Sequence, residues 1–254
     1  MGTHRNFRYF LSAILSAILA CSVSGISLAS GTTQFSADTV ESMPGQDSRQ
    51  GRIYVGANQV RTDNQINGET IIQIIDMGQQ QAIMINPAQK SFMRMKAQGG
   101  PAPQDQAGGG NPCAGMQNLA CKEVGTDRFN GRPVRKYEIS GAGQQGVLQV
   151  WVDEERSLPV RQIMPDGSGM EMRLVGREQR SGRKVEKWEM EGHGPDGQSQ
   201  TSLQWYDPEL KMNIREERPG GFVRELINIK PGKQPAELFS VPAGYSEIRP
   251  PQGG

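Results

Sequence analysis

The chain has 254 residues with 28 Lys or Arg and 27 Asp or Glu, which gives a formal net charge of +1 with His neutral. This balance argues against a nucleic-acid partner, because such partners usually require a basic patch. Beyond the first 29 residues no apolar run reaches the roughly 20 residues that a membrane-spanning helix needs, so we expect no transmembrane segment in the mature chain.

Residues 1–29 read as a secretory signal peptide. Arg5 and Arg8 form a basic start, and Phe10–Ala20 is an apolar stretch too short to span a bilayer. Ser27-Leu28-Ala29 fits the small-x-small cleavage pattern, so the mature chain is expected to begin near Ser30 and to reside in the periplasm.

An alternative processing site lies within the same leader. Ile18-Leu19-Ala20-Cys21 is close to a lipobox, the signal that attaches a lipid to cysteine. If Cys21 is lipidated, the protein would be anchored to a membrane instead. Both outcomes remain open on the sequence.

Cysteine usage points to one disulfide. Cleavage near Ser30 removes Cys21 and leaves Cys113 and Cys121, which should pair in an oxidising compartment. Their spacing does not match a zinc knuckle or a CxxC redox pair, and the mature chain has a single His, His193. We therefore predict neither a metal nor a cofactor.

Residues 30–248 are predicted to form a single antiparallel β domain, because short alternating runs are separated by turn signals every 8–12 residues. The expected strands, in order, are Phe35–Met43 (or a short helix), Arg52–Val55, Gln59–Asp63, Glu69–Asp76, Ala82–Ile85, Ser91–Lys96, Gly146–Asp153, Leu158–Met164, Met170–Val175, Ser202–Tyr206, Met212–Glu216 and Phe222–Ile229, followed by a short helical turn at Pro235–Phe239. Gln, Gly and Pro dominate 97–112, which is predicted to be a flexible loop, and 249–254 is predicted to be a disordered tail.

One stretch occurs twice. Val124–Ser140 and Val175–Glu191 share Val-Gly, a polar run, a Gly-Arg turn and Val-x-Lys-aromatic-Glu, and each precedes a strand with Trp and Asp in the same positions. Alternation after the turn predicts a hairpin with one wet and one dry face. Two copies favour a meander within one sheet over a closed propeller.

Several short motifs follow one another along the chain: Gly51-Arg-Ile-Tyr-Val55, Asp76-x-Gly78 with Ala82-Ile-Met-Ile85-Asn86-Pro87, the repeated hairpin, and Leu238-Phe239-x-Val241-Pro-x-Gly244-Tyr245. In this order they resemble the periplasmic lipoprotein carriers of the LolA/LolB type and their uncharacterised relatives. The resemblance implies a mainly β fold, an unclosed antiparallel half-barrel with a small helical lid and an apolar cavity that holds acyl chains.

The residues expected to line that cavity are large and apolar. They are Met84, Phe92, Tyr137, Trp151, Trp188 and Trp205. Methionine adapts its shape to a partner, so the Met-rich strands are compatible with lipid tails. The alternatives are ordinary gap-filling by methionine and tryptophans that serve as core pillars.

Nothing in the sequence predicts catalysis. Asp153 and Asp207 follow the ends of equivalent strands, where a turn role explains them, and His193 has no nucleophile motif around it. We expect an exported envelope protein that binds a lipid or a lipoprotein acyl chain on the concave face of a curved sheet. The alternative is a non-enzymatic structural or interaction module that engages another envelope protein.

Overall fold

The computed structural model describes residues 33–96, 112–113, 119–141 and 146–249. The predicted signal peptide with Cys21, nearly all of the predicted loop at 97–112 and nearly all of the tail at 249–254 lie outside these residues. No helix among the described residues is both long and apolar enough to cross a membrane.

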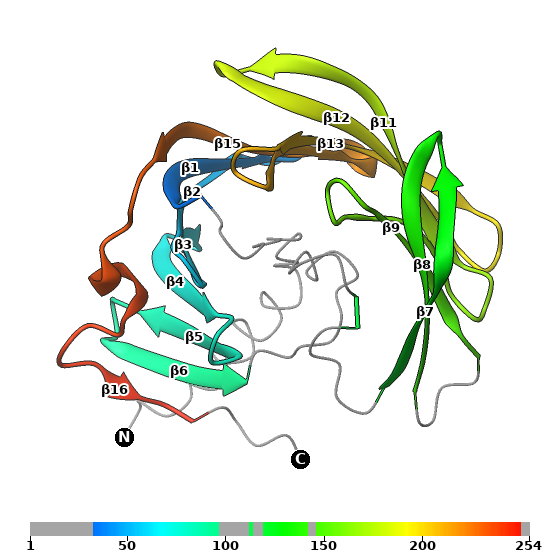
Figure 1. Ribbon diagram of the computed structural model, residues 1–254. Helices are drawn as coiled ribbons and strands as arrows, with labels where there is room; N and C mark the ends of the chain where they lie inside the picture. The colour runs from blue at the N-terminus through cyan, green and yellow to red at the C-terminus, as the bar shows by residue number, and fades with distance from the viewer. Residues whose placement is uncertain (1–32, 97–111, 114–118, 142–145, 250–254) are drawn as a thin grey trace.

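The described residues form one sheet of sixteen strands, drawn in Figure 1. Its strands are β1 (Phe35–Ser42), β2 (Arg49–Val55), β3 (Gln59–Ile66), β4 (Glu69–Asp76), β5 (Gln81–Asn86), β6 (Ser91–Lys96), β7 (Leu119–Phe129), β8 (Arg132–Gly141), β9 (Leu148–Asp153), β10 (Pro159–Ile163), β11 (Gly169–Arg180), β12 (Arg183–His193), β13 (Ser199–Asp207), β14 (Met212–Arg218), β15 (Phe222–Pro231) and β16 (Ser246–Glu247). Phe35–Met43, for which strand and helix were both open, is thus a strand.

The sheet has two arms that meet at its middle. The first arm runs from β1 to β6 and the second runs from β7 to β15, and β15 pairs antiparallel with β1. β7 and β16 lie at opposite ends of the strand order and do not pair with each other, so the sheet is curved but unclosed. The predicted mainly β, unclosed antiparallel architecture is confirmed.

The duplicated stretch forms two equivalent hairpins, β7–β8 and β11–β12. Both turns use a left-handed pair, Asn130-Gly131 with φ of 48° and 75° and Ser181-Gly182 with φ of 49° and 78°, which suits a two-residue hairpin. Both hairpins also carry a register shift at the Val-Gly pair, at Val124 and at Val175. Because both belong to one sheet, the predicted meander is confirmed.

The aspartate that follows each hairpin caps the next turn and binds the arginine of its own copy. Asp153 accepts the backbone N–H groups of Glu155 and Arg156 at 3.0 and 2.9 Å. It also accepts a hydrogen bond from Arg132. Asp207 pairs with the equivalent arginine in the second copy. These contacts agree with the turn role predicted for both aspartates.

Apolar side chains collect in four clusters instead of one. The largest joins strands of both arms and includes Phe35, Val55, Val60, Trp205 and Leu226. The other three lie on β4–β6, around β8–β12, and on β8–β9. Along most of its length this curved sheet has no second layer formed by described residues, and the core is therefore divided.

Helical structure in the described residues consists of two short 3₁₀ helices, η1 (Pro219–Gly221) and η2 (Ala236–Phe239). The second agrees with the predicted turn at Pro235–Phe239. It belongs to the C-terminal segment (residues 232–249), which leaves β15, passes along the outer side of the first arm and ends by pairing β16 parallel to β6 (Figure 1).

Candidate functional site

The first arm presents two apolar faces, and the C-terminal segment covers the outer one. Residues opposite each other in the register share a face, so Ile74, Ile83 and their neighbours point to the same side. On that side they pack with Phe239 and Leu238 of the C-terminal segment. Arg61 fastens the contact by donating from Nη1 to the carbonyl oxygen of Leu238 at 3.0 Å.

The C-terminal segment passes so close to Gly56 that this position favours glycine. A Cβ built on Gly56 would lie only 3.0 Å from Cζ of Phe239. Phe239 is 7 % exposed, and a larger residue at position 56 would force its ring to shift by a few tenths of an ångström. The outer face is therefore closely packed and leaves no room for a ligand at this point.

The opposite, inner face of β3–β6 faces the hollow side of the curved sheet. Its apolar members, placed by the strand register, are Val60, Ile66, Ile71, Ile75, Ala82, Met84, Met93 and Met95. Only Val60 belongs to one of the four apolar clusters. Ile71, Ile75, Met84 and Met95 are partly exposed. This inner apolar face, as we call it, is thus not covered by the apolar clusters of the described chain.

The inner apolar face has an ordered shape. Val60 lies opposite Ile75, Ile75 opposite Ala82, and Ala82 opposite Met95, which makes one apolar row across four strands. The row crosses three strand spacings, about 14 Å at the usual spacing of roughly 4.8 Å. A second row runs Thr62, Gln73, Met84 and Met93 and carries no charge.

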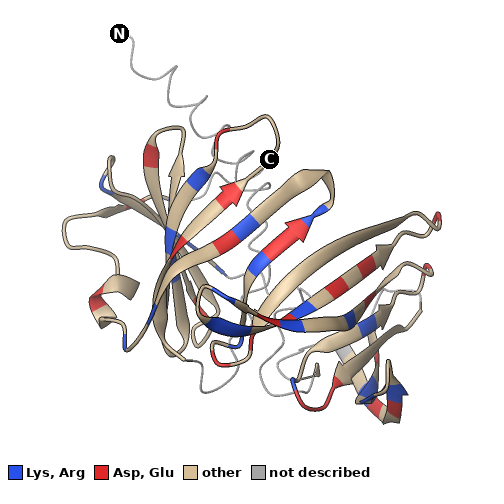
Figure 2. Cartoon of the chain, turned by 90° about the horizontal axis from the view of Figure 1, so that it is seen from above, with Lys and Arg blue, Asp and Glu red and all other residues tan. Residues whose placement is uncertain are grey.

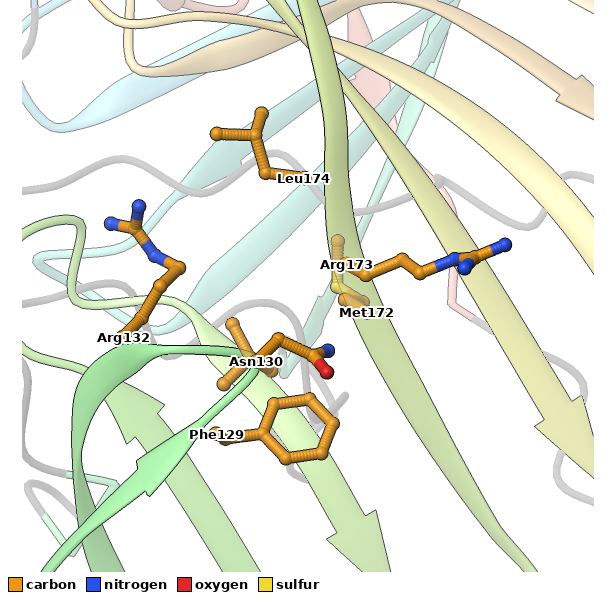
Figure 3. Close-up of a pocket in the computed structure, with 7 residues that line it drawn as sticks. Phe129, Asn130, Arg132, Met172, Arg173 and Leu174 are labelled. Carbon is orange, nitrogen blue, oxygen red and sulfur yellow. The ribbon is translucent and has the colours of Figure 1, made fainter.

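A separate hollow lies where the turn of β7–β8 approaches β10 and β11. It has a volume of about 150 Å³ and is lined by Phe129, Asn130, Arg132, Val160, Met172, Arg173 and Leu174 (Figure 3). Ligand pockets usually measure about 300–1,000 Å³, so this hollow is small for an acyl chain. Figure 3 shows its two guanidinium groups pointing away from each other.

Both arginines of this hollow already have carboxylate partners. Arg132 bonds Asp153 and, at 3.0 Å, Glu155. Arg173 donates from Nε to Glu189 at 2.9 Å. An anion entering the hollow would have to compete with these carboxylates, which makes it a poor anion site.

Elsewhere on the second arm, opposite charges alternate along neighbouring strands (Figure 2). Arg161 and Glu171 are 3.0 Å apart, and Arg215 and Glu225 are 2.6 Å apart, in both cases between directly opposed residues. Such pairs stabilise the register of the sheet. They leave charges of both signs interspersed on the surface.

Two buried titratable groups, Glu186 and Tyr206, lie opposite each other on β12 and β13. Burial acts to raise the pKa of Glu186, but the hydrogen bonds and positive charge of Arg156 outweigh it and bring the pKa below its usual value. Burial raises the pKa of Tyr206 to about 12. At neutral pH Glu186 is therefore ionised and Tyr206 keeps its proton.

The six residues predicted to line a cavity are distributed over the sheet. Trp151 and Trp188 share the cluster around β8–β12, whereas Trp205 belongs to the largest cluster, Tyr137 to the one on β8–β9 and Phe92 to the one on β4–β6. Met84 alone lies on the inner apolar face. The structure brings only two of the six together, and contact of any of them with a ligand stays a prediction.

The residues that sequence reasoning missed are Ile71, Ile75, Ala82, Met93 and Met95. Each lies in a predicted strand, and alternation alone would have placed it on one of two faces. Both faces of β4 carry isoleucine, so the hydrophobic pattern could not tell which face is covered.

The predicted disulfide is present. Cys113 and Cys121 are joined, with 5.4 Å between their Cα atoms. Both pack against the cluster that contains Tyr137 and Val150. The disulfide thereby holds the chain before β7 against β8 and β9.

Two of three comparisons with known proteins give a resemblance. A family model described as "Domain of unknown function (DUF4412)" matches residues 38–158, just under half of the chain. A search of curated proteins gave no match. Solved structures gave several matches of low sequence identity.

Three of these structures cover most of the chain. A LolA superfamily protein from Nitrosomonas europaea is 11 % identical, covers 85 % of this chain and 92 % of its own, and has a TM-score of 0.40. A DUF1329 family protein from Desulfovibrio piger is 12 % identical, with coverages of 91 % and 95 % and a TM-score of 0.38. A putative outer membrane lipoprotein-sorting protein domain from Vibrio parahaemolyticus is 11 % identical, with coverages of 83 % and 91 % and a TM-score of 0.37.

The resemblance to LolA-type proteins that the sequence predicts is found again among these structures. At TM-scores of 0.40 or below, nothing about ligand or activity follows from it. The function proposed below is drawn from this chain's own residues.

Proposed function

We propose that this protein is an exported envelope protein that binds an apolar ligand, the acyl chain of a lipid or of a lipoprotein, on the inner apolar face of β3–β6. We place it in the periplasm on account of the predicted signal peptide at residues 1–29. Lipidation of Cys21, if it occurs, would tether the same binding face to a membrane. We propose a binding role and no catalytic one.

The observation that carries this proposal is the unequal cover of the two apolar faces. Strands that are apolar on both sides normally have both sides covered. In β4–β6 the outer side packs against Phe239 and its neighbours, whereas Ile75, Met84 and Met95 on the inner side remain partly exposed. Val60, Ala82 and Met93 on the same face are buried. A contiguous apolar face that remains partly exposed is a candidate binding site.

Size and chemistry of the face suit an acyl chain. The apolar row from Val60 to Met95 is about 14 Å long, and Glu69, at the end of β4, is the one charged residue that the register places on this face. Each CH₂ group that leaves water contributes about 0.8 kcal/mol. A chain that buries about eight CH₂ groups along this row would therefore gain about 6 kcal/mol.

The test is direct titration of the purified protein with a fluorescent fatty acid, dansyl-undecanoic acid. We expect saturable binding to the wild-type protein and at least a tenfold loss of affinity for Ile75→Glu, which places a carboxylate in the middle of the row. Met77→Glu, in the turn after β4 and 38 % exposed, is the matched control and should bind as the wild type does.

Two outcomes would overturn the proposal. One is a wild-type protein that does not bind the probe and carries no lipid in native mass spectrometry. The other is an Ile75→Glu variant that binds with unchanged affinity. Either result would favour the structural or interaction module instead.

A further inference from the structure

Three methionines of the inner apolar face lie next to one another. Met84 of β5 is directly opposite Met93 of β6, and Met95 follows on the same face of β6 two residues later. Met93 is 9 % exposed, while Met84 and Met95 are partly exposed. None of the three belongs to the four apolar clusters, unlike Met172 and Met212.

This spacing lets the three thioether sulfurs converge. Residues directly opposite on antiparallel strands have Cβ atoms about 4.5–5.5 Å apart, and diagonal neighbours are about 7–8 Å apart. Each methionine side chain has three rotatable bonds beyond these positions. Ala82, opposite Met95, is small and leaves space beside Met84.

Surroundings of the three sulfurs are neutral. Gln73 lies opposite Met84, and Ile75 lies opposite Ala82. The two basic residues nearest in sequence, Arg94 and Lys96, alternate to the outer face. A weakly hydrated, singly charged cation would meet soft donors here and little competing charge.

We propose that Met84, Met93 and Met95 form a binding site for Cu(I). Thioether ligands are soft and select Cu(I), whereas zinc prefers thiolate and imidazole and magnesium prefers oxygen. The strand register supplies three such donors on one uncharged face. Cu(I) binding would depend on the three sulfur atoms. It is a second function, independent of the proposed acyl-chain binding.

The experiment uses the full chain with Cys21→Ser, so that no free thiol competes for the metal. Cu(I) is titrated anaerobically in the presence of ascorbate and the chromophoric chelator bicinchoninate. We expect the protein to withdraw one equivalent of Cu(I). We expect the triple variant M84L/M93L/M95L to lose at least tenfold in affinity, because leucine keeps the volume and apolarity of methionine but lacks the sulfur.

Matched controls are Met43→Leu and Met77→Leu, two exposed methionines away from the site, which should leave the titration unchanged. A wild-type protein that withdraws no Cu(I), or a triple variant that withdraws as much as the wild type, would overturn the proposal. Titration of the wild-type protein with dansyl-undecanoic acid separates the two functions: a protein that withdraws Cu(I) but does not bind the probe supports the Cu(I) site and overturns the acyl-chain function, and a protein that binds the probe but withdraws no Cu(I) does the reverse.

Discussion

Replacing Asp207 by Asn should destabilise the protein strongly, because this carboxylate is fully buried and serves three partners. Asp207 is 0 % exposed. Oδ1 accepts the backbone N–H groups of Glu209 and Leu210 at 2.9 and 3.0 Å, and Arg183 donates to Oδ2. Asparagine keeps an oxygen for the amides but removes the charge that faces Arg183.

The magnitude follows from the surroundings of Arg183. Removing one partner of a buried ion pair costs about 3–5 kcal/mol. The Arg183 side chain is 16 % exposed and keeps Glu209 at 3.0 Å, so we expect the lower end, about 3 kcal/mol. With a urea dependence of about 3 kcal/mol per molar, this lowers the unfolding midpoint by about 1 M.

Urea unfolding followed by tryptophan fluorescence measures this shift. Asp38→Asn is the matched control, because Asp38 pairs with Arg52 at 3.6 Å while both side chains are well exposed, and such pairs contribute under about 1 kcal/mol. Asp153→Asn, the equivalent change in the first copy, should reproduce the large effect. If Asp207→Asn shifts the midpoint no more than Asp38→Asn does, the reasoning about the buried pair is wrong.

Three further changes test other parts of the structure. Phe239→Ala should cost about 3–5 kcal/mol in urea unfolding, because its ring is buried against the outer face of β4–β6. Replacing Cys113 and Cys121 by Ser should cost about 2.5 kcal/mol in the same assay, since the disulfide closes a short loop with a sequence separation of 8. Arg156→Gln should remove the interaction that lowers the pKa of Glu186, so its destabilisation should be largest at pH 7 and should fade as the pH drops through the folded-state pKa of Glu186, below about 4.5.

Controls and contradicting results can be stated for these three predictions. Glu237→Ala, on the exposed side of η2, should change stability by no more than about 0.5 kcal/mol, and a similar effect for Phe239→Ala would mean that the C-terminal segment is not held by its ring. The serine double variant should be insensitive to dithiothreitol. An Arg156→Gln variant whose destabilisation is the same at pH 7 and pH 3 would contradict the assignment to ionised Glu186.

Local chemistry was sufficient to predict the strands, the turns, the disulfide and the duplicated hairpins. Alternation at Tyr137 and Trp188 and the left-handed Asn130-Gly131 and Ser181-Gly182 turns depend on neighbouring residues alone. Among the strands that the structure describes, only β16 was not predicted, and it consists of two residues that pair with β6.

Only the tertiary structure decided which apolar face is covered. β1 pairs with β15, about 190 residues later, as the bond from Asn228 to Asp38 shows, and this junction sends the C-terminal segment along the outer side of the first arm. Ile74 and Ile75 are alike in sequence, yet one packs against Phe239 and the other faces the hollow side. Hydrophobic alternation determines that a residue points to one face or the other, but distant pairing determines what lies over each face.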